Sequence, residues 1–248
     1  MSRKLGKRRE KASLGKMLLL LVVLAAILAA LIIILVTRGQ DEASETSVGT
    51  LAGVGVVIDA GHGGFDVGSS GVNTNVNESD INLQISIKLQ KRLEQLGAQV
   101  TMTRSDENAL AGSKDEDMAK RREIIETSGQ DVTISIHQNI YQDSNVTGPQ
   151  VFYSPGSVMG EKLATAIQTS MNAQLEVETP RNAQAAAFYI VQSGSAPAVI
   201  VECGFLSSPV EEALLMNEEY QNRVVKSIID GLQNYLAEMR ESEGSDAV

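Results

Sequence analysis

The chain has only two histidines, and each follows a run of β-branched residues that is typical of a short strand. His62 stands in Asp-Ala-Gly-His-Gly-Gly after the apolar run at residues 54–58, and His137 follows the run at residues 132–136. The glycines beside His62 let other backbone or a ligand come close. Neutral imidazole is the commonest metal ligand, so two histidines at matching strand ends suggest a metal site. For either histidine alone, the alternative is a hydrogen-bonded structural role.

Several carboxylates could complete such a site. Asp66, Glu78 and Asp80 all follow His62 closely, and spacing alone does not choose among them as a third ligand. Glu202 comes after Val199-Ile200-Val201 and needs a partner, because burying an unpaired carboxylate is expensive. Taken alone, Glu202 could be a structural carboxylate held by amides or an arginine. Two histidines and one carboxylate leave zinc a fourth position for water, and such a site hydrolyses its substrate.

The segments that must position these residues alternate between strand and helix after Gly53. Near-apolar strands between helices imply an α/β fold: a single domain with a mostly parallel mixed sheet of about six strands and helices on both faces. Sites in such sheets lie beyond the carboxyl ends of the strands, so His62, His137 and Glu202 should gather at one edge. Strands are expected at residues 54–58, 98–103, 131–136, 150–154, 188–192 and 198–202, and helices at residues 78–96, 118–128, 157–174, 210–216 and 220–239.

The N-terminal region predicts a membrane anchor. Residues 17–36 are uncharged and form about 30 Å of helix, which matches the thickness of a bilayer core. Seven lysines and arginines precede them, so the positive-inside rule places the N-terminus in the cytoplasm and the rest of the chain outside. The alternative is a cleaved signal peptide and a secreted protein, although signal peptides usually have a shorter apolar region. The expected organisation is a basic cytoplasmic tail (1–16), one transmembrane helix (17–36), a linker (37–52), a catalytic domain (53–240) and a polar tail (241–248).

Charge and cysteine content exclude some classes of protein. The formal net charge is −10 although residues 1–16 are strongly basic, so the remainder is acidic. Nucleic acid is therefore not an expected partner, because binding phosphates needs a basic face. The single cysteine, Cys203, excludes an internal disulfide. Adjacent strand residues point to opposite faces, so Glu202 and Cys203 cannot both face one site, and Cys203 is interpreted as a small buried hydrophobe.

Four ordered blocks resemble the zinc-dependent N-acetylmuramoyl-L-alanine amidases of the type that includes the cell-division and spore-cortex amidases. The blocks are Ile58-Asp59-Ala60-Gly61-His62-Gly63-Gly64, Glu78-Ser79-Asp80, Ser135-Ile136-His137-Gln138-Asn139 and Val201-Glu202-Cys203-Gly204-Phe205-Leu206-Ser207. The resemblance covers about residues 56–236. It implies that His62, Glu78 and His137 hold Zn²⁺ and that Glu202 is the catalytic acid/base.

The resemblance also implies a substrate and a reaction. The substrate would be peptidoglycan, cut at the amide between muramic acid and L-alanine during cell-wall or spore-cortex remodelling. Two alternatives stay open: another zinc peptidoglycan hydrolase, such as a peptidase or deacetylase, or a wall-binding protein without catalysis. No protein partner is indicated.

Some residues outside the proposed ligand set also carry expectations. Arg121 matches an arginine of the family and is expected to form a structural ion pair. The chain departs from the common pattern at Gln138 and Ser208, and neither is expected to touch the proposed ligands. Ser69 and Asn139 are among the polar loop residues that could line the groove.

Overall fold

The structure is a computed structural model that describes residues 51–245. Its six strands form one sheet in the order β2-β1-β3-β6-β4-β5. Strands β2, β1, β3 and β6 are parallel, whereas β4 runs antiparallel to β6 and β5 runs parallel to β4. The strands are β1 (Gly55–Ala60), β2 (Gln99–Met102), β3 (Val132–Asn139), β4 (Gln150–Tyr153), β5 (Gln184–Ala185) and β6 (Ala198–Phe205). The expected mostly parallel, six-stranded mixed sheet is confirmed.

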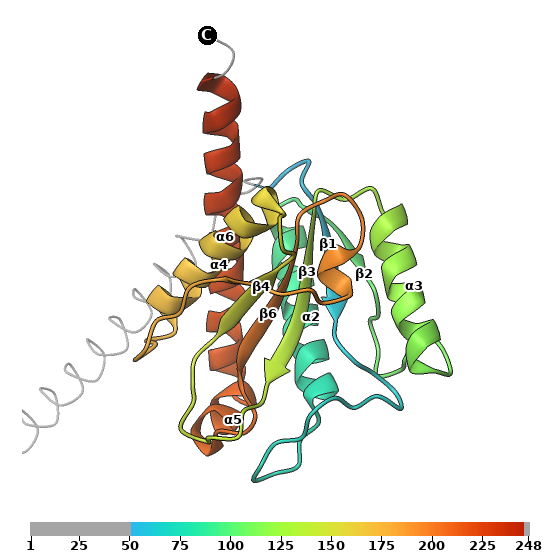
Figure 1. Cartoon of the computed structure of the whole chain (residues 1–248), viewed down its shortest axis with the longest axis vertical. Coiled ribbons are helices and arrows are strands. Elements are labelled where there is room, and N and C mark those ends of the chain that lie inside the picture. Colours follow the sequence, from blue (N-terminus) through green and yellow to red (C-terminus); the bar gives the residue numbers. More distant parts are fainter. Residues whose placement is uncertain (1–50, 246–248) are drawn as a thin grey trace, which may run out of the picture. The chain divides into compact units, whose positions relative to one another are not determined.

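Helices cover both faces of this sheet (Figure 1). Val56 and Ile58 of β1 belong to the main core, which α2, α4 and α6 close, whereas Val57 points the other way and packs with Ile125 of α3 and Ile190 of η1. The alternation follows from the strand geometry, in which neighbouring side chains face opposite sides. The helices are α2 (Glu78–Gln95), α3 (Lys114–Thr127), α4 (Val158–Gln174), α5 (Pro209–Leu215) and α6 (Glu218–Ser245), with the 3₁₀ helix η1 (Ile190–Gln192).

Local sequence explains where the helices begin. The Ser157 side chain accepts a hydrogen bond from the N–H of Gly160 and caps α4. Ser113 caps α3 through the N–H of Glu116, so this helix begins at Lys114, four residues before the expected start at residue 118. Glu78 and Asp80 lie in the first turn of α2, where the helix dipole interacts favourably with negative charge.

Other boundaries also differ from the sequence-based expectation. Residues 188–192 do not form the expected strand, and residues 190–192 form the 3₁₀ helix η1. Ile190 and Val191 are both buried on the same side of the sheet, in two separate clusters, whereas neighbouring residues of a strand would face opposite sides. β3 and β6 each extend three residues further than expected, so His137 lies within a strand and not after it, and Glu202 lies inside β6 and not at its end. The last helix was expected to end at residue 239, but it continues as α6 to Ser245. The two-residue strand β5 was not expected.

The described part of the chain begins at the amino edge of the sheet. The N–H of Leu51 donates to the carbonyl of Leu96, and Leu51 is fully buried. Among residues 51–245, no helix has the length and apolar character needed to cross a bilayer. The tail, the transmembrane helix and nearly all of the linker expected in residues 1–50 lie outside the described residues.

Candidate active site

The structure brings His62, His137 and Glu202 to the carboxyl edge of three neighbouring strands. His62 follows the end of β1, His137 is near the end of β3, and Glu202 pairs with His137 in the register between β3 and β6. Paired residues on neighbouring strands share a face of the sheet. An irregularity in the ladder between His137 and Asn139 marks this edge, and such bulges often re-aim side chains beside active sites.

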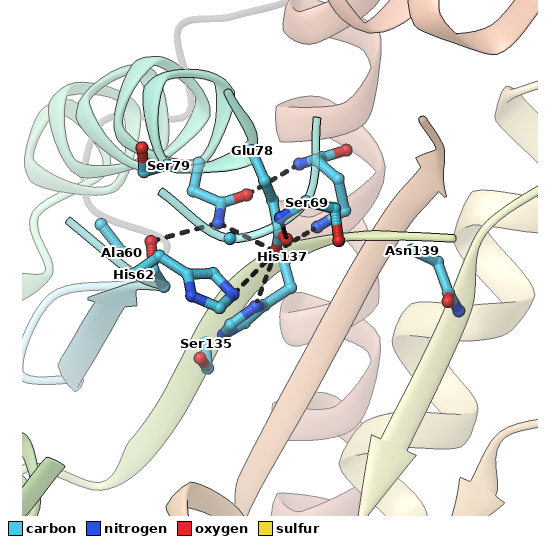
Figure 2. A network of polar contacts seen from close by, with 12 residues as sticks. Ala60, His62, Ser69, Glu78, Ser79, Ser135, His137 and Asn139 are labelled. Atoms are coloured by element: carbon cyan, nitrogen blue, oxygen red, sulfur yellow. Dashed lines mark hydrogen bonds and ion pairs between the residues drawn. The ribbon is translucent and has the colours of Figure 1, made fainter. Parts of the chain in front are cut away.

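Glu78 completes a compact group with the two histidines. Its Oε1 lies 3.2 Å from Nε2 of His62 and 3.0 Å from Nδ1 of His137. One ligand atom from each residue falls within 4.8 Å of the others. The three side chains point toward one another from the β1 loop, α2 and β3 (Figure 2). Two imidazole nitrogens and a carboxylate oxygen in this arrangement fit a single divalent metal ion.

The surroundings of Glu78 keep it ionised. The side chain is only 3 % exposed, and its oxygens accept hydrogen bonds from the N–H groups of Ser69 and Gln138 and from Nδ2 of Asn82. Burial alone would raise the pKa of Glu78, but the hydrogen bonds and charges of His137 and His62 hold it well below its usual range. Glu78 is therefore an anionic carboxylate with a fixed orientation, as a metal ligand would need to be.

The structure separates the three carboxylates that spacing left equivalent. Asp66 binds the other ring nitrogen of His62, with its Oδ1 3.0 Å from Nδ1. This contact favours a proton on Nδ1 of His62. The lone pair on Nε2 is then free to face Glu78 and the candidate metal position. Asp80 is exposed and receives a hydrogen bond from Asn77 at the start of α2. Among the three, only Glu78 contacts both histidines.

Two glycines allow His62, Glu78 and His137 to approach one another. A Cβ on Gly61 would lie 2.3 Å from Nε2 of His137, and a Cβ on Gly68 would lie 2.6 Å from Oε2 of Glu78. His62 itself has a φ of 61°, a left-handed conformation that few residues other than glycine adopt. Backbone strain of this kind persists only where surrounding contacts impose it, and it concentrates at functional sites.

Glu202 faces the group as a half-buried carboxylate, and one of its oxygens has no protein partner among the described residues. Its Oε2 is buried and accepts no hydrogen bond from any residue in the described range. Burial raises the pKa of Glu202 to about 7, although the charge of His137 opposes the rise. The neighbouring Cys203 points into the main core, where it is fully buried, as the alternation of the strand predicts. Burial raises the pKa of this thiol, so Cys203 is not an activated nucleophile.

Buried arginines support the segment that carries His62. Arg121 forms the expected ion pairs, at 2.8 Å to Asp59 and 2.6 Å to Asp117, and donates to the carbonyls of Ala60 and His62. Arg104 donates to the same segment and was missed by sequence reasoning, because nothing in its charged loop distinguishes it.

Three other expectations have mixed outcomes. Ser69 contributes its backbone to Glu78, and Asn139 lies apart from the group, where its side chain accepts from the N–H of Ile140 (Figure 2). The expectation that Gln138 touches no ligand is wrong, because its N–H donates to Oε1 of Glu78 at 3.2 Å. Asn82 was also missed, although its position four residues after Glu78 places the two on one side of α2.

Comparison with known proteins decides the family. The profile of a family described as N-acetylmuramoyl-L-alanine amidase matches residues 56–234. The chain belongs to this amidase family. Its similarity to the germination-specific N-acetylmuramoyl-L-alanine amidase of Bacillus subtilis (strain 168) is 33% identity over 196 residues, which cover 76% of this chain and 82% of that protein.

Solved amidase structures share the fold. The CwlD amidase from Clostridioides difficile, in complex with the GerS lipoprotein, superposes with a TM-score of 0.72 at 32% identity and covers 74% of this chain and 98% of its own. The catalytic domain of the amidase CwlV from Bacillus (Paenibacillus) polymyxa var. colistinus gives 0.67 at 31% identity, with 74% and 98% covered. The α/β domain is therefore that of the amidase family.

Proposed function

We propose that this chain is a zinc-dependent N-acetylmuramoyl-L-alanine amidase that hydrolyses the amide between muramic acid and L-alanine in peptidoglycan. Its role would be the remodelling of cell wall or spore cortex. The observation that carries the proposal is the convergence of His62, Glu78 and His137, with the unpartnered Oε2 of Glu202 beside them, in a member of the amidase family.

The ligand atoms of the proposed zinc site are Nε2 of His62, Oε1 of Glu78 and Nδ1 of His137. Two imidazoles and one carboxylate are a typical catalytic zinc set with room for further ligands. When bound, zinc supplies a Lewis acid that polarises the scissile carbonyl and makes water a better acid.

Glu202 moves the proton in the proposed reaction. Its carboxylate accepts a proton from the attacking water, and the same oxygen then donates it to the nitrogen of the leaving L-alanine. Burial raises the pKa of Glu202 above its ordinary value in the absence of the ion, and a raised pKa suits a group that must both take up and release a proton. Asp66 holds the ring of His62, and the amides of Ser69 and Gln138 hold Glu78, so the reacting groups are oriented before the substrate arrives.

Digestion of purified muropeptides tests this proposal. We expect mass spectrometry to find a free lactyl carboxyl on muramic acid and a free amino group on L-alanine. A chelator should abolish the cleavage, and added zinc should restore it. Cleavage within the stem peptide, or loss of acetyl groups, would instead support the alternative zinc hydrolases, and binding to the wall with no product would support a non-catalytic protein.

We also propose that residues 17–36 anchor the protein, with the N-terminus in the cytoplasm and the catalytic domain outside. Support comes from the length and apolar character of this segment and from the basic residues before it. In intact protoplasts, external protease should digest the domain, and the domain should sediment with membranes. Recovery of the domain in the medium, with about the first forty residues of the chain removed, would favour a cleaved signal peptide.

A further inference from the structure

Arg104 is a buried cation whose side chain is bonded to backbone. The residue is 4 % exposed, and its four hydrogen bonds within the described part of the chain all go to carbonyl oxygens. Nε donates to Ala60 at 2.8 Å, Nη2 donates to Gly61 and Ser79 at 2.9 Å each, and Nη1 donates to Asp106 at 2.8 Å. A desolvated guanidinium is costly to bury, so this position needs a reason beyond filling space.

The bonded carbonyls belong to the two segments that carry proposed ligands. Ala60 and Gly61 directly precede His62, and Ser79 directly follows Glu78. Arg104 thus joins the end of β1 to the first turn of α2 through a single planar group. Because the guanidinium is rigid and its donors diverge at fixed angles, it sets the spacing between the carbonyls that it binds.

Neighbouring contacts show that the guanidinium has little room to shift. A Cβ on Gly63 would lie 3.0 Å from Nε and 3.1 Å from Cδ of Arg104, so the loop after His62 packs directly on this side chain. Asn82 donates to the same Gly61 carbonyl at 3.1 Å, and Arg121 donates to the same Ala60 carbonyl at 2.7 Å. Burial and the positive charge of Arg121 lower the pKa of Arg104 to about 10, which still leaves it protonated at neutral pH.

We infer that Arg104 is a positioning residue for the metal site, because it fixes the distance between the backbone segments of His62 and Glu78. The inference rests on the proposed function, since it assumes that these two side chains bind the same ion. Arg104 touches neither the substrate nor the ion in this role and acts only through the carbonyls of residues 60, 61 and 79.

Cobalt binding to the metal-depleted protein tests the inference with a readout other than activity. Arg104→Lys keeps the charge and much of the alkyl chain but loses the fork of donors, and Arg104→Met also loses the charge. We expect both variants to bind Co²⁺ at least about tenfold more weakly than the parent, with an altered visible absorption spectrum. Arg181→Met is the matched control, because Arg181 also donates to backbone carbonyls, those of Thr147 and Gly148, which adjoin no proposed ligand.

The outcomes separate the inference from the proposed function. If the parent protein binds no cobalt, the proposed metal site itself is refuted. If the parent binds and Arg104→Lys binds equally tightly with the same spectrum, Arg104 does not position the ligands. If Arg104→Lys fails to fold, or if Arg181→Met weakens cobalt binding as much, the arginine supports the fold in general and the inference is overturned. Arg181→Met should lower the unfolding temperature at most and leave cobalt affinity unchanged.

Discussion

Gly61→Ala should disable the proposed metal site without disturbing the fold. The added Cβ would lie 2.3 Å from both Cε1 and Nε2 of His137, whereas ordinary contacts begin near 3.4 Å. The N–H of Gly61 is bonded to the carbonyl of Ile136 and its carbonyl to Arg104, so the backbone cannot easily retreat. The imidazole must therefore move by about 1 Å, and a misplacement of that size costs on the order of 100-fold in rate.

Two assays measure the effect. We expect kcat/KM on muropeptides to fall about 100-fold and Co²⁺ to bind more weakly, with an unchanged far-UV circular dichroism spectrum. Gly112→Ala is the control, because a Cβ there meets nothing within 4 Å and no left-handed conformation is involved. Parent-like metal affinity and activity in Gly61→Ala would refute the reasoning, since His137 would then not occupy the position that excludes a side chain.

Three further perturbations have definite expected outcomes. Glu202→Gln should lower kcat by at least about 100-fold while Co²⁺ affinity stays at the parent value, because the carboxylate is assigned to proton transfer and not to holding the ion; a variant that digests peptidoglycan at the parent rate would contradict the assignment. Burial opposes ionisation of Asp59, but Arg121 and the hydroxyls of Ser135 and Thr103 hold the pKa of Asp59 below the ordinary 3.8. The ionised carboxylate therefore stabilises the fold above pH 3.8, and this stabilisation is lost as the pH falls through the lowered pKa. Asp59→Asn should therefore cost about 3 kcal/mol at pH 7 in urea unfolding and show a shallower loss of stability below pH 3.8 than the parent; parallel pH curves would count against the ion pair. Cys203 should resist iodoacetamide at pH 8 in the native protein and react after denaturation, because burial raises the pKa of its thiol; rapid native labelling with loss of activity would revive a role for the thiol.

The sequence predicts the main elements of the site because the topology constrains them. Once the strands are parallel, residues near their carboxyl ends share one edge, and this places His62, His137 and Glu202 together whatever the details of the loops. Helical spacing likewise gives α2 closely and the start of α6 to within two residues, since their apolar positions recur on one face.

Long-range contacts explain what the sequence does not predict. Spacing alone does not select Glu78 over Asp66, and only the resemblance to the amidases named Glu78, because the loop backbone is left-handed at His62 and no local pattern signals that conformation. Three of the four carbonyls that Arg104 binds are 25 to 44 residues away, so its role appears only in three dimensions. At residues 188–192, β-branched and aromatic residues favour a strand, but burial of Ile190 and Val191 on one side of the sheet requires a tighter turn.

The entry point of the described chain bears on how the protein can be handled. Leu51 is fixed to Leu96 at the amino edge of the sheet, and the proposed ligands lie at the carboxyl edge. A tag, a fusion partner or a solid support joined ahead of Leu51 is therefore attached at the edge of the sheet opposite the proposed ligands. Immobilisation by that end should leave large, insoluble sacculi free to reach the reacting groups.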